Sequence, residues 1–407
     1  MSVDVRTIRA PEVAPWVDAM RTGFLDEPTT TSAEADWRAG FFDLDHTWAA
    51  FDGDRVVGTL RSFDTRLTVP GDRDVSATAL THVTVSASHR RRGLLSRMIR
   101  GDLATCAERG DAVSVLVAAE WPIYGRFGYG PATEGVKYEI DTVGLTVTAP
   151  RDGSIESVDR DTYRAAVPAI YEAYRLGQPG AIVRNDWWWD VSTGVVAVEG
   201  RTTPKFFALG RSESGEVDGF LAHRIEDHWV DVRPRSRLLV DDLVGVGTAA
   251  TVRLWRHCIE TDWIGLVVAD DRGVEDPLRW HLDDARAIAE RERTDRLWLR
   301  ILDLPQALTG RAYHAPGALV LEIDDPLDYA TGRFRLEAGE GGATCTPTDA
   351  SPDLALSVQA LSSAYLGGYT LASMGAAGLV TECRPGSLAV ADAMFRSPVA
   401  PSCPTHF

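Results

Sequence analysis

The sequence predicts an α/β fold of mixed (α+β) character, made of two successive modules with the same order of elements and a smaller third region. Patterns of strand and helix alternate through the first part of the chain. A polar stretch with Pro150 and Gly153 interrupts them, and a similar order then starts again. A third set of patterns opens with an apolar run near Leu297. We therefore expect domains at residues 1–149, 150–294 and 295–407.

The first module begins with a strand at Val5–Ile8 and a helix from Pro11 to about Phe24, since proline is favoured in the first turn. Asp52-Gly53-Asp54 is typical of a hairpin turn. A second helix is expected from about Gly93 to Arg109, closed by Gly110. The remaining strands are expected at Trp48–Asp52, Arg55–Ser62, Arg66–Val69, Ala77–Val85 and Val113–Ala118.

The second module repeats this order and the third region departs from it. Helices of the second module are expected at Arg160–Tyr174 and Thr248–Glu260, the latter preceded by Gly247. Its strands are expected from Ile155 and at Lys205–Gly210, Val217–His223, Leu238–Val246 and Ile264–Ala269. The third region should contain strands Leu297–Leu302, Ala318–Ile323 and Arg333–Glu337 and helices Val358–Tyr365 and Ser387–Phe395. Three prolines make the tail after Ser397 an extended strap over the surface.

Composition narrows the function classes. The chain has 407 residues, of which 44% are hydrophobic, and 42 Lys+Arg against 59 Asp+Glu give a net charge of −17. This charge disfavours nucleic acid and anionic membranes and favours cationic small molecules, or it serves solubility alone. No apolar run is long enough to cross a bilayer and no leader is recognised. Five scattered cysteines and nine unclustered histidines predict no disulfide framework and no metal, and suit the cytoplasm.

The segment Val83–Met98 carries the first chemical signal. A strand leads into the basic turn His89-Arg90-Arg91-Arg92-Gly93, which opens an apolar helix. Free backbone N–H groups at a helix N-terminus bind phosphate, and glycine permits close approach. The turn therefore suits a pyrophosphate, although a solvated basic turn is the alternative.

The segment Ala118–Ala132 carries the second signal. Glycines and prolines alternate with Tyr124, Phe127 and Tyr129 directly after a buried strand. Glycines permit the turns, so Tyr124 can point into a cleft. An aromatic-packed loop without chemistry is the alternative.

The pattern Arg90-x-x-Gly93-x-Leu95 resembles the signature of the Gcn5-related N-acetyltransferases (GNAT), with Leu95 where the family has a small residue. Such proteins bind acetyl-coenzyme A (acetyl-CoA) at this strand and turn. The resemblance implies that Val83, Thr84 and Val85 bind the pantetheine arm. It implies that the pyrophosphate is held by Arg91, Arg92, Gly93, Leu94, Leu95 and Ser96.

Together, His89–Leu95 and Ile123–Thr133 resemble the enhanced intracellular survival (Eis) family of acetyltransferases over the whole chain. Leu297–Ile301 and Cys345–Asp349 in the third region fit the same family. The resemblance implies tandem GNAT folds followed by a C-terminal sterol-carrier-protein-like α+β domain. It also implies a homohexamer and acetylation of amines such as those of aminoglycosides.

The family resemblance also implies roles for single residues. Tyr124 matches the proton donor to the departing sulfur, and the α-carboxylate of the last residue, Phe407, matches the proton acceptor. Ala119 and Glu120 match a pair that contacts the coenzyme. The substrate-lining positions fall on Phe24, Asp26, Trp37 and His82. His82 stands where the family has an aromatic residue, and His406 stands where an acidic residue often precedes the end.

Reference pKa values test this scheme. A lysine-like amine has a pKa of about 10.4 and an α-carboxyl has a pKa of about 3.5. The carboxylate is a poor proton acceptor for the amine because the two pKa values differ by roughly seven units. Burial of both groups brings the values closer together, and a relay through water is the alternative. Tyrosine, at about 10, lies roughly 1.5 units above a thiol. Backbone N–H groups of Val83–Val85 would polarise the carbonyl. Because no cysteine is placed for an acyl-enzyme, we expect direct transfer.

The remaining segments predict supporting roles. The second module's turn, Gly245-Val246-Gly247-Thr248, has no arginine before Arg253, which favours a non-catalytic copy. Trp187-Trp188-Trp189 either lines a cationic substrate pocket or packs in a core or interface. We expect no lipid in the third region.

Three functions remain open from the sequence. The first is acetylation of cationic small molecules, the second acetylation of protein lysines or polyamines, and the third a non-catalytic acyl-CoA or lipid-binding protein. Tyr124 together with Phe407 argues against the third.

Overall fold

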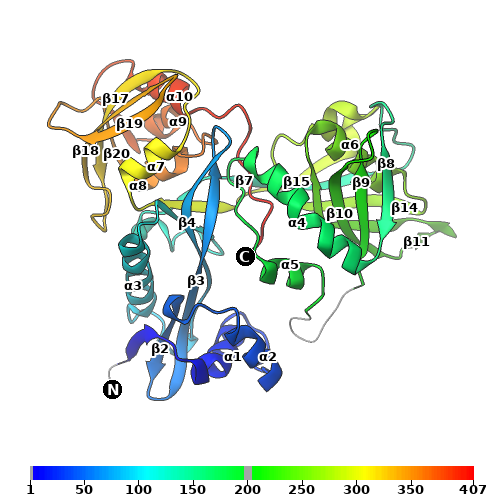
Figure 1. The fold of residues 1–407 in the computed structure, drawn as a ribbon, viewed down its shortest axis with the longest axis horizontal. Helices are drawn as coiled ribbons and strands as arrows, with labels where there is room; N and C mark the ends of the chain where they lie inside the picture. Colours follow the sequence, from blue (N-terminus) through cyan, green and yellow to red (C-terminus); the bar gives the residue numbers. More distant parts are fainter. Residues whose placement is uncertain (1–2, 197–203) are drawn as a thin grey trace.

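The computed structural model describes residues 3–196 and 204–407 and has three modules (Figure 1). Two seven-stranded sheets and one five-stranded sheet form their centres. The predicted α/β class with two similar modules and a smaller α+β region is thus confirmed. Among the described residues, no helix combines the length and the apolar character that crossing a bilayer requires.

The first module is a sheet with helices on both faces. Helices α1 (Val13–Gly23) and α2 (Ser32–Ala39) lie on one face, and α3 (Leu94–Arg109) packs on the other. The sheet has the order β1-β2-β3-β4-β5-β16-β6. Its strands are β1 (Asp4–Thr7), β2 (Thr47–Asp52), β3 (Arg55–Val69), β4 (Arg73–Val85), β5 (Val113–Val117), β16 (Leu297–Ile301) and β6 (Gly130–Pro131).

The hairpin β3–β4 is longer than the sequence pattern predicts. The expected strands Arg55–Ser62 and Arg66–Val69 form one strand, because Phe63–Thr65 pair with Ala77–Ala79 without interruption. The polar residues in this stretch face outward at the edge of the module, which hides the strand from a pattern based on burial.

The second module repeats the arrangement. Its sheet has the order β15-β7-β14-β13-β10-β9-β8, and a short hairpin, β11 (Trp229–Val230) and β12 (Arg233–Pro234), extends from it. Its helices are α4 (Arg160–Leu176), α5 (Asp186–Ser192) and α6 (Thr248–Glu260). Its strands are β7 (Glu134–Asp141), β8 (Ser154–Val158), β9 (Phe206–Arg211), β10 (Val217–Glu226), β13 (Ser236–Gly245), β14 (Ile264–Arg272) and β15 (Ile288–Asp295).

The two large sheets exchange strands. β7 precedes the predicted boundary at 149/150 but pairs with β14 and β15 of the second sheet. β16 follows the predicted boundary at 294/295 but inserts between β5 and β6 of the first sheet. Both predicted boundaries therefore differ from the boundaries of the sheets. Composition marks where a loop lies, whereas strand pairing between distant segments leaves no local signal.

The third module is an α+β layer that shares a core with the first. Its sheet has the order β19-β18-β17-β20-β21. Its strands are β17 (Gly317–Asp324), β18 (Gly332–Gly339), β19 (Gly342–Pro347), β20 (Leu354–Ser357) and β21 (Val380–Glu382). Its helices are α7 (Leu304–Gly310), α8 (Val358–Ala364), α9 (Leu371–Ala376) and α10 (Ser387–Phe395).

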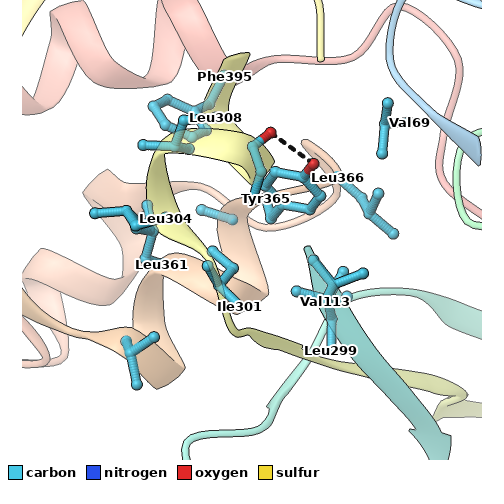
Figure 2. Packing of buried hydrophobic residues seen from close by; sticks show 14 of the residues in the cluster. Val69, Val113, Leu299, Ile301, Leu304, Leu308, Leu361, Tyr365, Leu366 and Phe395 are labelled. Atoms are coloured by element: carbon cyan, nitrogen blue, oxygen red, sulfur yellow. Dashed lines mark hydrogen bonds between the residues drawn. The ribbon is translucent and has the colours of Figure 1, made fainter. Parts of the chain in front are cut away.

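Figure 2 shows the core that joins the third module to the first. Leu299 and Val113, from neighbouring strands of the first sheet, belong to the same buried cluster as Leu304 and Leu361 of the third module. The hydroxyl of Tyr365 donates a hydrogen bond of 2.8 Å to the carbonyl oxygen of Ala307 in this core. The first sheet is therefore covered on part of one face by the third module.

The tail after Ser397 is extended, as predicted, but it is not a strap over the surface. Ser402, Cys403 and Thr405 are buried, and the C-terminus lies between the first and second modules beside α5 (Figure 1). The prolines determine the extended conformation of the tail. Its burial depends on contacts with distant segments, which the prolines do not predict.

Candidate active site

Strands β4 and β5 separate halfway along the first sheet. Their parallel pairing covers Ala77–Leu80 against Val113–Leu116 and then stops. β4 continues to Val85 with β3 as its partner strand, so no strand of the described residues pairs with the side of Thr81–Val85 that faces away from β3. Backbone groups of this kind need partners, and a linear ligand with amide groups can supply them.

A β-bulge lies in this part of β4. The pairing shifts between Thr59 and Arg61 of β3, so that His82 and Val83 together lie opposite Leu60. His82 takes a left-handed conformation with φ of 52°, and its carbonyl accepts a hydrogen bond of 2.9 Å from the hydroxyl of Thr59. Bulges twist a strand and re-aim its groups, and they are frequent beside active sites.

The N-terminus of α3 follows this strand after a short turn, residues 86–93, which includes the 3-10 turn Ala87–His89. Gly93 is the N-cap residue, with φ of 74°, and no side chain caps the helix. The first backbone N–H groups of a helix have no partner within it, so those of Leu94, Leu95 and Ser96 are available to an anion. Arg91 and Arg92 are exposed beside them. The turn thus combines free donors with two positive charges, as a pyrophosphate requires.

Tyr124 belongs to the buried cluster against which the unpaired part of β4 packs. Its ring belongs to the buried cluster of α3 and packs edge-to-face with Tyr129, with ring centroids 6.1 Å apart; Val83 and Val85 pack against the same cluster. Burial, with a smaller effect of the nearby Glu120 carboxylate, raises the pKa of Tyr124 to about 12. The phenol is therefore protonated throughout the neutral range.

The other residues that the sequence implicates in coenzyme binding differ in exposure: Ala119 and Glu120 are exposed, Leu95 and Ser96 are half-buried, and Leu94 is buried. Ala119 and Glu120 follow β5 in the loop that leads to Tyr124. Leu94 is buried in the core, so only its backbone N–H is offered to a ligand.

The last residue reaches the first module. Phe407 packs edge-on against Phe63 of β3, with ring centroids 5.8 Å apart and planes at 88°. β3 is the neighbour of β4, whose Val83 and Val85 pack against the cluster of Tyr124. Phe407 itself packs against the separate core cluster that contains Leu67 and Val69 of β3. Phe407 thus contacts β3 on the face that carries Phe63, whereas the cluster of Tyr124 lies on the opposite face of the same sheet, which α3 covers.

The second module holds the tail that ends at Phe407. Trp188 Nε1 donates to the carbonyl oxygen of His406 at 2.8 Å. The Arg184 guanidinium donates to the hydroxyl of Thr405 at 3.0 Å and to the carbonyl of Pro404 at 2.8 Å. Arg184 is itself fixed by an ion pair with Asp242 of 2.6 Å. These contacts give the second module a structural function for the site.

The three consecutive tryptophans have three different environments. Trp189 is buried in the core of the second module, and Trp188 holds the tail. Trp187 stacks on Trp37 of α2, with ring centroids 6.4 Å apart. Packing therefore accounts for Trp188 and Trp189, while Trp187 lies with the predicted substrate residue Trp37.

The predicted substrate residues do not all come together. His82 packs edge-on against Trp16, with ring centroids 6.0 Å apart. Burial first, and then the charges of Arg61 and Arg38, lowers the pKa of His82 to about 3. Phe24, by contrast, is 48% exposed, and Asp26 is exposed in the same loop after α1. Trp37 and His82 are thus half-buried and pack against other aromatic rings, whereas Phe24 and Asp26 are exposed.

Sequence reasoning missed three residues of this region. Arg61 and Phe63 lie on the face of β3 that meets Trp187 and Phe407, and Arg184 anchors the tail. A signal existed for Arg61, since a charge at an alternating buried position of a strand is unusual. Arg184 offered none, because its contacts join residues far apart in sequence.

The second module has the same strand–turn–helix order, but its strands are bridged. β13 and β14 are parallel up to Val240 and Ala269, and Leu243 stands at the same distance beyond the last pair as Val83 does in β4. The Arg272 guanidinium donates to the carbonyl of Leu243 at 2.7 Å and pairs with Asp276 at 2.9 Å. In the second module, a side chain thus occupies the backbone carbonyl of Leu243, whereas the corresponding part of β4 is available to a ligand.

One group of potential metal ligands lies on the α3 side of the first sheet. His46, Asp102 and Cys106 are buried with ligand atoms within 4.8 Å of one another. The Arg109 guanidinium lies 2.9 Å from His46 Nε2, and the Ser62 hydroxyl donates to Asp102 at 2.5 Å. The arginine brings positive charge to this group, which opposes the binding of a cation.

Comparison with known proteins follows the three modules. Residues 4–132 and 180–301 each match a model of an acetyltransferase (GNAT) domain, and residues 304–404 match a sterol carrier protein domain. The chain is 42% identical to an uncharacterised N-acetyltransferase of Streptomyces avermitilis, over 100% of this chain and 99% of that protein. It is 35% identical to the N-acetyltransferase Eis of Mycobacterium tuberculosis, over 85% of each.

Solved structures agree with these matches. The crystal structure of Eis1 from Mycobacterium abscessus superposes with a TM-score of 0.87 at 29% identity, covering 99% of this chain and 100% of that one. A GCN5-related N-acetyltransferase from Anabaena variabilis shares the fold, with a TM-score of 0.85 at 19% identity and full coverage of both chains. With relatives of this identity along most of its length, tandem GNAT folds and a sterol-carrier-protein-like domain, the chain belongs to the Eis family of GNAT N-acetyltransferases.

Proposed function

We propose that the chain transfers the acetyl group of acetyl-CoA directly to the amine of a small molecule, at the separation of β4 and β5. The observation that carries the proposal is the unpaired part of β4, Thr81–Val85, which leads through a short turn to the uncapped N-terminus of α3. The first suits the amides of pantetheine, and the second suits a pyrophosphate.

In this reaction the amine nitrogen attacks the thioester carbonyl, the carbon–sulfur bond breaks, and the sulfur leaves as a thiolate. Backbone N–H groups of Val83–Val85 stabilise the negative oxygen of the tetrahedral intermediate. The proton that the amine loses goes to the terminal carboxylate of Phe407, directly or through water. The phenol of Tyr124 faces the departing sulfur.

The raised pKa of Tyr124 defines its contribution. A pKa of about 12 lies roughly 3.5 units above that of an ordinary thiol, so complete proton transfer to the sulfur would cost about 5 kcal/mol. A hydrogen bond from the neutral phenol to the developing thiolate avoids this cost and still stabilises the leaving group. Tyr124 thus acts as a hydrogen-bond donor to the sulfur and keeps its proton. The coenzyme A thiolate is protonated from solvent as it leaves, and the terminal carboxyl returns the proton of the amine to solvent.

The second module, in our proposal, binds no coenzyme and presents the C-terminus. Arg272 bridges its strands, and Trp188 and Arg184 bind the tail. The amine class that family resemblance favours is cationic and aminoglycoside-like, and the exposed Asp26 and Asp36 offer negative charge at the surface near Trp37. Lysines of proteins and polyamines are the competing acceptors.

Release of coenzyme A from acetyl-CoA tests the proposal. The full-length protein is mixed with aminoglycosides, polyamines, lysine-containing peptides and small amino acids, and free thiol is followed with time. We expect release with at least one small amine and acetylation of that amine by mass spectrometry. No release with any amine would contradict acetyl transfer, and release with peptides alone would favour protein lysines.

A further inference from the structure

Arg61 is a buried arginine without a partner. It is 3% exposed, and its Nε is buried with no hydrogen bond. Within residues 3–196 and 204–407, no hydrogen bond or ion pair of its guanidinium is found, including with the terminal carboxylate of Phe407. Such burial is destabilising, because the guanidinium has lost its hydrogen bonds to water and has no acceptor that replaces them.

The other buried arginines of the described residues show that this is an exception. Each of them donates to a carboxylate or to a backbone carbonyl. Their partners are Glu34 for Arg21 and Arg38, Asp74 and Glu172 for Arg175, Asp242 for Arg184, Asp218 and Asp152 for Arg253, Ala149 for Arg256, Asp325 for Arg300 and Phe395 for Arg311.

Aromatic rings surround the Arg61 guanidinium but cannot satisfy it. Its central carbon lies 4.5 Å from the ring of Phe42, 5.5 Å from Phe63 and 5.7 Å from Trp187. Cation–π contacts favour the charge, yet they leave the guanidinium N–H donors without acceptors. Burial, with the charge of Arg38 as a smaller cause, lowers the pKa of Arg61 to about 10, so the group stays positive at neutral pH.

Two further buried polar atoms beside Arg61 lack partners. Trp187 Nε1, on one of the three rings, has no hydrogen bond, and the indole N–H can only donate. His82 Nδ1, on the neighbouring strand β4, has none either. Three buried nitrogens of this region therefore lack a hydrogen-bond partner, and the nitrogens of Arg61 and Trp187 can act only as donors.

This region adjoins the terminal residue and the bulge of β4. Phe63, two residues after Arg61 on the same face of β3, packs against Phe407. Arg61 itself pairs with Thr81 at the end of the bulge that contains His82. Asp43 is the carboxylate whose charge acts on Arg61, but it forms no ion pair with it. A ligand bound by Arg61 would therefore lie next to the proposed site of acetyl transfer.

We propose that Arg61, with the indole N–H of Trp187, binds an oxyanion carried by the amine substrate, either a carboxylate or a phosphoryl group. This inference rests on the proposed acetyl transfer and narrows its acceptor to an amine that also bears a negative group. The ammonium enters past the exposed carboxylates of the α1–α2 region, and the oxyanion reaches the arginine. This preference departs from the aminoglycoside-like class that family resemblance favours, because polycations without a negative group lack this partner and are poorer substrates.

Matched amines test the charge requirement in the wild-type protein. ω-Amino acids are compared with their carboxamides, and O-phosphorylated amino alcohols with the free amino alcohols, so that the two sources of an oxyanion are separated. We expect kcat/KM to be about 10- to 100-fold higher for the anionic member of at least one pair, since hydrogen bonds to charged groups are strong. Equal values in both pairs would overturn the inference and leave acetyl transfer standing.

Substitution of Arg61 should remove this preference. Arg61→Gln should lower kcat/KM for the anionic amine by about the same factor and change that of its neutral partner little. Arg61→Lys should restore part of the difference. Arg55→Gln is the matched control, because Arg55 lies on the same strand and is exposed. An equal loss for both amines in Arg61→Gln, with a normal Tm, would assign the arginine a structural role instead.

A binding measurement does not depend on turnover. Inorganic phosphate or propionate is added at constant ionic strength and with saturating coenzyme A, which occupies the turn at Gly93. Either anion should then raise the Tm of the wild type and of Arg55→Gln but not that of Arg61→Gln. A rise of the same size in Arg61→Gln, or no rise in the wild type, would overturn the inference. Coenzyme A release that fails with every amine would contradict the proposed function, whereas these Tm shifts judge the anion site alone.

Discussion

Trp188 of α5 donates a hydrogen bond of 2.8 Å to the backbone carbonyl of His406, the residue before the C-terminus. The donor belongs to the second module, and Phe407 contacts the first. This hydrogen bond connects the second module to the residue before the proposed proton acceptor, so the position of that acceptor depends on the docking of two modules.

Loss of this hydrogen bond should reduce turnover more than stability. Trp188→Phe keeps an aromatic ring and removes the N–H donor. We expect kcat to fall about 10-fold, because small displacements of a reacting group cost much rate. Trp263→Phe is the control, since Trp263 is 66% exposed and its ring contacts Trp229 of β11. An unchanged kcat in Trp188→Phe would show that the tail keeps its place without this contact.

Changes at the C-terminus test the carboxylate itself. Deletion of Phe407, or an added Gly-Ser extension, moves or removes the proposed acceptor while the anchored residues Pro404 and Thr405 remain. We expect kcat to fall by about 100-fold or more, the usual range for removing a positioned general base. Acetyl-CoA affinity, measured by calorimetry, should stay within a few-fold of the wild type. Full turnover in either variant would exclude the carboxylate.

Tyr124→Phe should separate hydrogen-bond donation from packing. The ring remains in its buried cluster, so the Tm should change little, while kcat falls about 10- to 100-fold with KM for acetyl-CoA unchanged. Tyr129→Phe is the contrasting variant, because its hydroxyl bonds to Ser114 at 2.7 Å inside the core. It should lower the Tm and preserve kcat. The reverse pattern would remove Tyr124 from the chemistry.

Acetyl-CoA should bind once per chain. The first module offers the uncapped turn at Gly93, whereas Arg272 bridges the strands of the second. Arg91→Gln and Arg92→Gln should each weaken acetyl-CoA binding by about 5-fold, the effect of one exposed charge-assisted hydrogen bond. Arg100→Gln, an exposed arginine of the same helix, is the control. Calorimetry that finds two sites per chain would contradict the assignment of the second module.

His82 should make stability depend on pH in a defined direction. Its pKa of about 3 in the folded protein lies below the ordinary value of 6.5, so the unfolded chain binds the extra proton between these values. Stability from this group is complete above pH 6.5 and is lost as the pH falls toward 3, by up to about 1.4 kcal/mol per pH unit. Denaturant unfolding of His82→Phe should show a shallower decline from pH 7 to pH 5 than the wild type. Parallel curves would contradict the prediction.

The sequence predicts the elements whose structure depends on residues nearby in the chain. The strand, turn and helix around Gly93, and the helix Thr248–Glu260 after Gly247, follow from local patterns and were placed correctly. The signature turn and Tyr124 followed from the same local reasoning and the family they indicate. These elements are set by periodicity and by backbone conformations that glycine permits.

What the sequence could not predict depends on contacts between distant segments. The isolation of Arg61 is visible only when the residues around it are known, because any of the many acidic side chains might have been its partner. The same holds for the Trp188–His406 contact and for Arg272 between β13 and β14. The sequence shows which side chains can donate or accept hydrogen bonds, but only the three-dimensional structure shows which of them are in contact.

The exchange of β7 and β16 has a practical consequence for dissecting this enzyme. A fragment that stops before Leu297 leaves β5 and β6 without the strand between them, and one that starts after Asp141 removes β7 from between β14 and β15. Neither acetyltransferase half can be expressed alone with its sheet intact. Truncated clones would expose open strand edges that invite aggregation, so functional mapping has to rely on point substitutions in the intact polypeptide.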